Sequence, residues 1–315
     1  MSTTPIARPF LKWAGGKAQL LDAFTRRAPI ELKAGALPVF VEPFMGGGAV
    51  YFYFNSIFRF KECHLFDINE ELVLVYSVVK NDVQGLINSL SDLADGFLSR
   101  DGAGRKEYYY ATRDMFNRTK PTIDFKQYGE EWIERAAQLI FLNRTCFNGL
   151  YRVNSRGGFN VPFGRYQNPN ILNEDLLRAD SAALRNTTVH LGDFTQSEPY
   201  ISEDTFAYFD PPYRPLNRTS SFTQYAKEGF TDEEQKRLAA FYAECDARGA
   251  RLMLSNSDPK NIDPDDGFFD DLYAGYHIDR VPARRMINCD GTKRGEIREI
   301  IVMNYDPNGP GDSGR

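Results

Sequence analysis

Six short apolar runs place the strongest constraint on the fold of this 315-residue chain, because they lack the alternation of apolar and polar residues that marks a half-exposed strand. The runs lie at residues 39–41, 64–66, 189–191, 206–209, 252–254 and 297–305. Runs of this kind are typical of parallel strands that are buried on both faces. Most end in a polar or glycine-rich turn, and helical stretches lie between them. We therefore expect an α/β fold with a doubly wound sheet, whose ligands bind beyond the carboxyl ends of the strands.

The alternation of strands and helices lapses over residues 81–186. This part of the chain predicts helices followed by a loop-rich stretch that contains several glycines. The helices are expected at residues 107–118 and 131–142. We interpret residues 81–186 as an inserted second domain, with residues 1–80 and 187–315 forming the domain into which it is inserted.

The charges are distributed unevenly, although 38 basic and 43 acidic residues give a net charge of only −5. This mild acidity argues against a polyanionic partner for the chain as a whole. Residues 135–173, however, hold five arginines and no Asp or Glu. No apolar stretch approaches the roughly 18 residues of a membrane-spanning helix, and no secretory signal is visible. Four scattered Cys and three His predict neither disulfides nor a metal site, which favours a cytoplasmic protein.

A glycine run follows the first predicted strand. Gly46 and Gly48 match the first two positions of the dinucleotide-binding pattern, but Tyr51 occupies the third position and no phosphate-loop ending is present. A nucleoside ligand without phosphates fits this loop better, while a plain tight turn is the alternative. Asp67 ends the next strand, where a carboxylate can accept hydrogen bonds from ribose hydroxyls or can cap the helix that follows.

The sequence Asp-Pro-Pro-Tyr at residues 210–213 follows another buried strand. Two consecutive prolines fix φ twice and remove two N–H donors. The Asp210 carboxylate and the Pro211 carbonyl are then rigid acceptors, and Tyr213 offers a flat face beside them. This turn suits the binding of an exocyclic amino group whose ring stacks on the tyrosine, and a proline-rich turn with an incidental tyrosine is the alternative.

Four segments in a fixed order carry a resemblance to a known family. They read Pro-Phe-Leu-Lys-Trp-Ala-Gly-Gly-Lys at 9–17, Glu-Pro-Phe-Met-Gly-Gly-Gly at 42–48, Asn-Gly-Leu-Tyr-Arg-Val-Asn at 148–154 with its continuation at 159–166, and Asp-Pro-Pro-Tyr at 210–213. The chain resembles the Dam-type DNA adenine methyltransferases, which form the D12 class with motifs in the α order, and in particular the members that methylate GATC. The resemblance implies a Rossmann-like methyltransferase sheet with an inserted, mainly helical target-recognition domain.

The resemblance also implies S-adenosylmethionine as the cofactor. Residues 1–80 would form the cofactor-binding half of the catalytic domain, and residues 187–315 the remainder. In the family the N-terminal motif and the glycine loop contact the methionine part of the cofactor, and an acidic strand end holds its ribose. Carried over to this chain, the cofactor-binding residues are Trp13, Lys17, Phe44, Gly46, Gly48, Asp67, Asp193, Phe194 and Asp210, and the catalytic residues are Asp210, Pro211 and Tyr213.

The arginine-rich stretch is then expected to bind double-stranded DNA through phosphate and base contacts. Arg152 is the candidate for a bidentate contact with guanine and Leu150 for contact with a thymine methyl group. Phe147 stands where the family carries an aromatic wedge, and the segment 215–225 resembles a loop that closes over the flipped base. The remaining candidates are the polar readers Asn148, Asn154 and Asn160 and the phosphate clamps Arg144 and Arg165. A merely solvated loop is the alternative interpretation.

We expect methyl transfer to the 6-amino group of adenine, after base flipping and without a covalent intermediate. Transfer to the cytosine 4-amino group, RNA or a protein amide is the alternative within the same chemistry. A Rossmann-type oxidoreductase and an inactive DNA-binding module are the alternatives outside it. A cytosine carbon-5 enzyme is excluded because none of the four Cys follows a proline. A restriction endonuclease acting on the same site is a possible partner.

Overall fold

The computed structural model describes residues 6–214, 230–283, 297–307 and 309. The chain forms two compact units. The first unit comprises Met1–Gly16, Gly46–Ser56 and Phe66–Gly192, and the second comprises Lys17–Met45, Ile57–Leu65 and Asp193–Arg315. No described helix is both long and apolar enough to cross a membrane.

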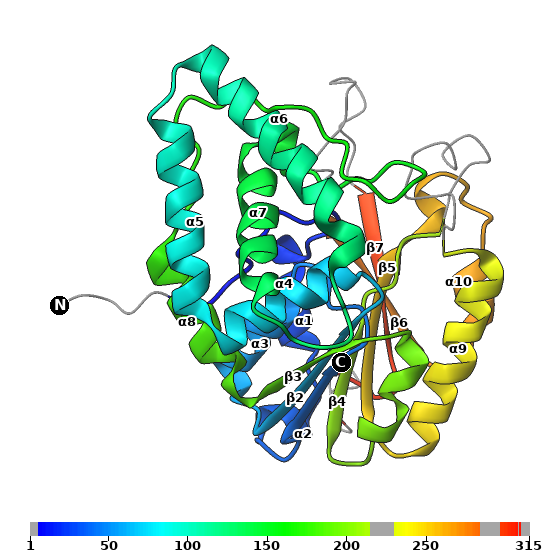
Figure 1. Cartoon of the computed structure of the whole chain (residues 1–315). Helices are drawn as coiled ribbons and strands as arrows, with labels where there is room; N and C mark the ends of the chain where they lie inside the picture. Colours follow the sequence, from blue (N-terminus) through cyan, green and yellow to red (C-terminus); the bar gives the residue numbers. More distant parts are fainter. Residues whose placement is uncertain (1–5, 215–229, 284–296, 308, 310–315) are drawn as a thin grey trace. The chain divides into compact units, whose positions relative to one another are not determined.

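A seven-stranded, mostly parallel sheet is the central element, with the strand order β3-β2-β1-β4-β5-β7-β6 (Figure 1). The strands are β1 Val39–Glu42, β2 Glu62–Asp67, β3 Thr187–Leu191, β4 Thr205–Phe209, β5 Arg251–Ser257, β6 His277–Ala283 and β7 Ile297–Met303. Strand β1 pairs in parallel with β2 and β4, and β4 pairs in parallel with β5. Strand β7 runs antiparallel to both β5 and β6.

All six predicted strands are present, but two details of the prediction are wrong. The run at 297–305 was expected to be a parallel strand, whereas β7 is antiparallel to both of its neighbours. The run at 189–191 was expected to be buried, whereas β3 is largely half-exposed because it lies at the edge of the sheet. Strand β6 was not predicted, since most of its residues, including Arg280, are partly exposed and it forms no apolar run.

The first unit contains five long helices and the start of another. They are α3 Ala49–Phe58, α4 Glu70–Asn81, α5 Val83–Leu98, α6 Gly102–Thr119, α7 Glu131–Thr145 and α8 Glu174–Ala183, with the 3-10 turns η2 Lys120–Thr122, η3 Phe147–Gly149 and η4 Leu184–Asn186. The predicted helices at 107–118 and 131–142 are confirmed as parts of α6 and α7. Helix α7 contacts α4, α5 and α6 (Figure 1) and is buried along most of its length. It is therefore the core helix of this unit.

Side-chain caps explain where four of these helices begin. The caps are Asn69 for α4, Asp82 for α5, Asp101 for α6 and Asn173 for α8, each of which accepts a hydrogen bond from a backbone N–H in the first turn. A cap of this kind satisfies a donor that has no partner within the helix.

The second unit combines most of the sheet with short helices and one long one. Its helices are α1 Leu21–Arg27, α2 Ile30–Lys33, α9 Asp232–Ala247 and α10 Phe268–Leu272, with the 3-10 segments η1 Ala18–Leu20, η5 Phe194–Tyr200 and η7 Pro259–Asn261. The Thr231 hydroxyl accepts a hydrogen bond from the Glu234 N–H and so caps α9. Phe206, Tyr208 and Leu252 are fully buried, so the core of this unit lies along β4 and β5.

Candidate functional site

The Asp-Pro-Pro-Tyr turn of the second unit follows β4 directly and holds a buried lysine. The Lys17 ammonium lies 2.6 Å from Asp210 Oδ1 and donates to the Tyr213 hydroxyl at 3.1 Å. It also lies 4.7 Å from the centroid of the Tyr213 ring, within the range of a cation–π interaction. Lys17 is 3% exposed while Tyr213 is 40% exposed. The tyrosine ring is thus accessible, and the charge beneath it is not.

Two further residues complete this cluster. The Tyr213 hydroxyl donates to Glu299 Oε1 at 2.8 Å, and Glu299 Oε2 lies 3.9 Å from the Lys17 ammonium. The Ser255 hydroxyl donates to Asp210 Oδ1 at 3.3 Å. Glu299 was not predicted from the sequence, although a charged residue beside the apolar run of β7 was a usable signal. We call Lys17, Asp210, Tyr213, Ser255 and Glu299 the Lys17 cluster.

The charges in the Lys17 cluster depend on one another. Burial lowers the pKa of Lys17, but Asp210, Tyr213 and Glu299 outweigh it, and the pKa is raised overall. Burial raises the pKa of Asp210 and of Glu299, and the positive charge of Lys17 opposes the shift at both carboxyl groups. Lys17 is therefore firmly cationic, and each carboxylate depends on it for compensation.

Side chains on α9 and β5 hold the proline turn in place. The Gln235 side chain on α9 donates to the Pro212 carbonyl at 3.3 Å. Asn256 on β5 donates in turn to the Gln235 side-chain oxygen at 3.4 Å, and both side chains are buried. Pro211 is buried as well. These contacts fix the Pro212 carbonyl without using the Asp210 carboxylate.

The glycine loop of the first unit closes onto Asp67. The Gly46 N–H donates to one carboxylate oxygen of Asp67 at 3.0 Å, and the Asn69 N–H donates to the other at 2.8 Å. Gly48 has a φ of 66°, and a Cβ there would lie 2.5 Å from the Tyr76 hydroxyl, so only glycine fits. The cap of α4 is Asn69, so the alternative interpretation of Asp67 as the helix cap is wrong. Burial raises the pKa of Asp67, and its backbone donors oppose the shift.

Trp13 packs against this loop within the first unit. A Cβ on Gly47 would lie 3.1 Å from the Trp13 Cβ. The indole stacks on Tyr151, with ring centroids 5.0 Å apart and an interplanar angle of 26°. Trp13 is half-buried, so it has both a packing role and a face in contact with solvent.

An aromatic group in the second unit contains two more of the predicted residues. The Phe44 ring lies 5.4 Å from that of Phe194 and 5.7 Å from that of Phe230. Arg237 covers the Phe194 ring at 4.2 Å and pairs with Asp193 at 2.8 Å. The hydrogen bonds from Arg237 lower the pKa of Asp193 to about 2. Asp193 therefore stays ionised and forms an ion pair with Arg237.

The predicted DNA-reading residues of the first unit lie on a small loop whose residues form hydrogen bonds with one another. The Arg152 guanidinium donates to the Asn160 side-chain oxygen at 2.7 Å, and the Asn154 side chain accepts from the Arg156 and Gly158 N–H groups. Asn148 is exposed with a φ of 57°, and Phe147 is 51% exposed. Leu150 is half-exposed. Two short antiparallel bridges, Cys146 to Phe163 and Val153 to Phe159, hold the loop closed.

The arginines of this stretch do not share one environment. Arg165 is exposed, while Arg144 is half-buried and donates to the Phe10 carbonyl at 2.6 Å. Burial lowers the pKa of Arg144, and nearby Arg8 adds to the effect. Arg135 is 2% exposed, so the interpretation of the whole acid-free stretch as phosphate-binding is wrong for this residue.

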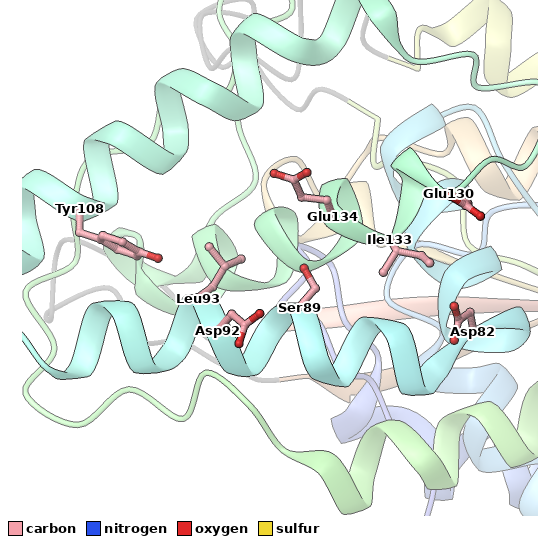
Figure 2. A pocket seen from close by; sticks show the side chains of 8 residues that line it. All are labelled: Asp82, Ser89, Asp92, Leu93, Tyr108, Glu130, Ile133 and Glu134. Atoms are coloured by element: carbon pink, nitrogen blue, oxygen red, sulfur yellow. The ribbon is translucent and has the colours of Figure 1, made fainter.

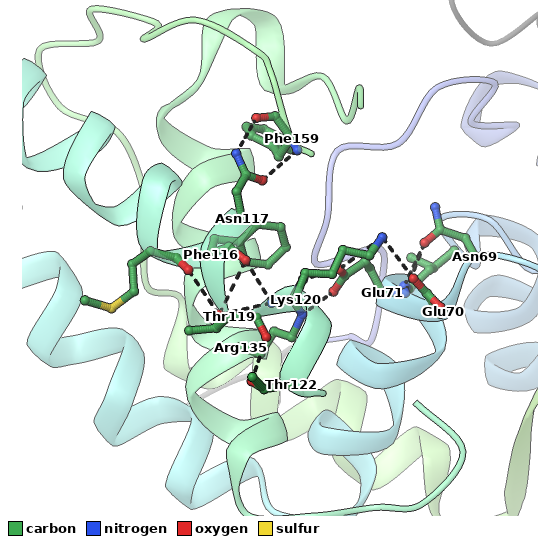
Figure 3. A network of polar contacts seen from close by, with 12 residues as sticks. Asn69, Glu70, Glu71, Phe116, Asn117, Thr119, Lys120, Thr122, Arg135 and Phe159 are labelled. Carbon is green, nitrogen blue, oxygen red and sulfur yellow. Dashed lines mark hydrogen bonds and ion pairs between the residues drawn. The ribbon is translucent and has the colours of Figure 1, made fainter. Parts of the chain in front are cut away.

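Arg135 is instead the centre of a buried network (Figure 3). Its guanidinium binds the Glu71 carboxylate through two hydrogen bonds, donates to the Phe116 carbonyl at 3.0 Å, and lies 4.1 Å from the Phe116 ring centroid. Lys120 pairs with Glu70 at 2.9 Å. Asn117 exchanges two hydrogen bonds with the Phe159 backbone. The network therefore joins α4, α6 and α7 to the loop that holds Arg152.

A pocket of about 620 Å³ lies in the first unit, among side chains of α5, α6 and α7 (Figure 2). Its lining is Asp82, Ser89, Asp92, Leu93, Tyr108, Glu130, Ile133 and Glu134. None of these is a predicted site residue, and four of them are acidic. Their charge disfavours phosphate groups at this pocket.

The predicted site residues thus fall on both units. The first unit holds Trp13, Gly46, Gly48, Asp67 and the predicted DNA-binding residues, and the second holds Lys17, Phe44, Asp193, Phe194, Asp210, Pro211 and Tyr213. The predicted closing loop at 215–225 lies outside the described residues.

Comparisons with known proteins match most of the chain. A family profile described as D12 class N6 adenine-specific DNA methyltransferase matches residues 13–287. The type II methyltransferase M.MjaIII of Methanocaldococcus jannaschii is 52% identical over 95% of this chain and 99% of its own length. The type II methyltransferase M1.LlaDCHI of Lactococcus lactis is 36% identical over 95% of both chains. The DNA adenine methylase of Escherichia coli K12 is 32% identical over 95% of this chain and 96% of its own.

Proposed function

The chain belongs to the D12 class of N6 adenine-specific DNA methyltransferases, and we propose that it methylates the adenine of GATC in duplex DNA. It is an adenine-specific DNA methyltransferase, and its family uses S-adenosylmethionine as the methyl donor. The proposal of GATC rests on the string at 148–154 and its similarity to GATC-methylating members. A cytoplasmic location on the nucleoid is part of the proposal.

The residues of the cofactor motifs fit S-adenosylmethionine. This group supplies an electrophilic methyl carbon on a sulfonium when it is bound. Asp67 is a half-buried carboxylate suited to ribose hydroxyls, and the tight turn at Gly46 and Gly48 lets a ligand approach the backbone. The half-buried Phe44 ring offers aromatic surface for an adenine ring, and Phe194, which is 2% exposed, packs beside Phe44 and supports it. Trp13, Lys17, Asp193 and Asp210 complete the set that we propose.

The Lys17 cluster is suited to hold an amino group next to an aromatic face. The Asp210 carboxylate and the Pro211 carbonyl would accept hydrogen bonds from the two N–H groups of the adenine amine. These contacts keep electron density on a nitrogen whose lone pair is otherwise delocalised into the ring. The lone pair of that nitrogen would be directed at the methyl group that bound S-adenosylmethionine supplies, and the Asp210 carboxylate would be positioned to take the proton that the nitrogen releases.

Tyr213 would compensate part of the free energy needed to extrude the base. Base flipping costs a few kcal/mol because stacking and pairing are lost. Stacking on an aromatic side chain returns about 1–3 kcal/mol per base in other proteins. The exposed ring and the anchored hydroxyl of Tyr213 support this role.

The loop around Arg152 would read the DNA. Its hydrogen bond to Asn160 orients the guanidinium, so that it can contact guanine in a fixed direction. Exposed Phe147 fits the proposed wedge, and exposed Arg165 fits a phosphate contact. We retain Asn148, Leu150, Asn154 and Arg144 as the other proposed contacts.

The finer organisation is also part of the proposal. We propose a doubly wound, Rossmann-like catalytic domain formed by residues 1–80 and 187–315, with a mainly helical target-recognition domain at 81–186. The relatives that are named type II methyltransferases favour a restriction endonuclease of the same specificity as the partner.

The single observation that carries this function is the cluster of Asp210, Tyr213 and Lys17 at the end of β4. Transfer of a tritiated methyl group to duplexes with and without GATC, followed by nucleoside analysis, tests it. Label in N6-methyladenine from GATC duplexes alone is the expected result. Label in adenine of other duplexes would overturn the GATC assignment. Absence of label in adenine from any duplex would overturn the substrate itself.

A further inference from the structure

Glu299 carries an oxygen atom whose environment the reaction described so far does not explain. The residue is 5% exposed on β7. Its Oε1 accepts the hydrogen bond from Tyr213, but its Oε2 is buried without a hydrogen-bond partner among the described residues. A buried carboxylate oxygen without a donor destabilises a fold. Because this oxygen destabilises the fold, we expect it to serve a function.

The only described cation near this oxygen is Lys17, which lies between two carboxylates. Its ammonium is 2.6 Å from Asp210 Oδ1 and 3.9 Å from Glu299 Oε2. The first distance is a charge-assisted hydrogen bond, and the second is just beyond one. A displacement of about 1 Å would turn the second distance into a hydrogen bond.

The proposed reaction requires Asp210 to change partners. In this structure both Lys17 and Ser255 donate to Asp210 Oδ1. A cation held on the same carboxylate withdraws electron density and weakens that group as an acceptor for an incoming amine. Asp210 accepts hydrogen bonds from the adenine amine most strongly when the Lys17 ammonium binds a different acceptor.

We propose that Glu299 is a positioning residue that takes the Lys17 ammonium from Asp210 when the amino group of the target adenine arrives. The inference rests on the proposed function. Lys17 moves from Oδ1 of Asp210 to Oε2 of Glu299 and remains charged, so no proton is transferred in the exchange. Tyr213 stays anchored throughout, because it uses the other oxygen of Glu299.

The test is the Glu299→Gln variant. Glutamine keeps the volume and the acceptor for Tyr213, but its other terminal atom is an amide nitrogen that cannot accept from Lys17. We expect the single-turnover rate of methyl transfer to fall by about tenfold to a hundredfold, the range of one charge-assisted hydrogen bond, with unchanged affinity for the cofactor. The Tm should stay the same or rise, since a poorly compensated buried charge is removed.

Glu71→Gln is the matched control for stability. Glu71 is also a buried glutamate, but both of its oxygens bind Arg135, so its variant should lower the Tm. If Glu299→Gln lowers the Tm as Glu71→Gln does and leaves the rate intact, Glu299 is merely structural and the inference is overturned.

Double-mutant cycles identify the residue through which Glu299 acts. With Lys17 as the intermediary, the rate loss caused by Glu299→Gln persists in a Tyr213→Phe background and shrinks in a Lys17→Met background. If Glu299→Gln causes no loss of rate in the Tyr213→Phe background, the proposal is overturned. If the Lys17→Met variant is too slow for its rate to be measured, the Tyr213→Phe comparison decides alone. A wild-type enzyme that does not methylate adenine would instead overturn the proposed function.

Discussion

Two buried ion clusters, one in each unit, differ in how completely their charges are compensated. In the first unit Arg135 and Glu71 form a bidentate pair whose side chains are each 1% exposed. The remaining guanidinium donor binds the Phe116 carbonyl and the Thr119 hydroxyl. In the second unit one cation, Lys17, faces two carboxylates, and one carboxylate oxygen has no hydrogen bond among the described residues.

The difference separates a structural role from a functional one. A buried pair in which every guanidinium nitrogen and both carboxylate oxygens have partners fixes the geometry of its surroundings and leaves little capacity for a ligand. A cluster with an uncompensated acceptor is less stable, yet it can respond when a new donor arrives. Arg135 thus holds helices together, whereas we propose that Lys17 can exchange Asp210 for Glu299 as its partner.

The largest expected effect comes from removing the Asp210 carboxylate from the Lys17 cluster. Asp210→Ala should lower the single-turnover rate by about a thousandfold, because the amine then lacks the acceptor that sustains its electron density. Affinity for S-adenosylmethionine, measured by calorimetry, should change by much less. A loss of cofactor affinity as large as the loss of rate would show that Asp210 acts through cofactor binding alone and does not activate the amine.

Breaking the compensated pair should affect stability rather than chemistry. Arg135→Met leaves the Glu71 carboxylate buried without its partner, and we expect the free energy of unfolding to fall by about 3–5 kcal/mol. Denaturant unfolding measures this loss, and the double variant Arg135→Met with Glu71→Leu should recover much of it. A single variant as stable as wild type would mean that the pair contributes nothing to the fold.

The contrast also explains what could be predicted from the sequence. Apolar runs located β1, β2, β4 and β5 because strands buried on both faces need no polar alternation. Lys17 and Asp210 were each identified from local motifs, but not as a pair. Arg135 was misread because its partner Glu71 lies 64 positions earlier in the chain. Glu299 was missed because 86 positions separate it from Tyr213.

Asp67 provides an intermediate case, since both of its oxygens accept from backbone N–H groups and the carboxylate has capacity for a further donor. Asp67→Asn should weaken cofactor binding by about tenfold, because an amide replaces one acceptor with a donor that faces a backbone N–H. Calorimetric titration measures this change. Unchanged affinity would remove Asp67 from the ribose site and leave it as a residue that only supports the glycine loop.

The smallest effect is expected in the dependence of stability on pH, and it distinguishes two kinds of carboxylate in the second unit. Arg237 lowers the pKa of Asp193 from its ordinary value of 3.8 to about 2, so this group stabilises the fold above pH 3.8. That stabilisation is lost as the pH falls toward 2. Both partners are more than one-third exposed, so solvent screens the pair and the slope of Tm against pH should be shallow.

Glu299 should show the opposite sign. Burial raises its pKa above the ordinary value of 4.5, so it favours the fold when protonated, and that contribution is lost as the pH rises through its raised pKa. Asp193→Asn should therefore flatten the Tm profile between about pH 4 and pH 2, and Glu299→Gln should flatten it above about pH 4.5. If both variants altered the same limb of the profile, the distinction between the partly exposed, arginine-paired Asp193 and the buried Glu299 would fail.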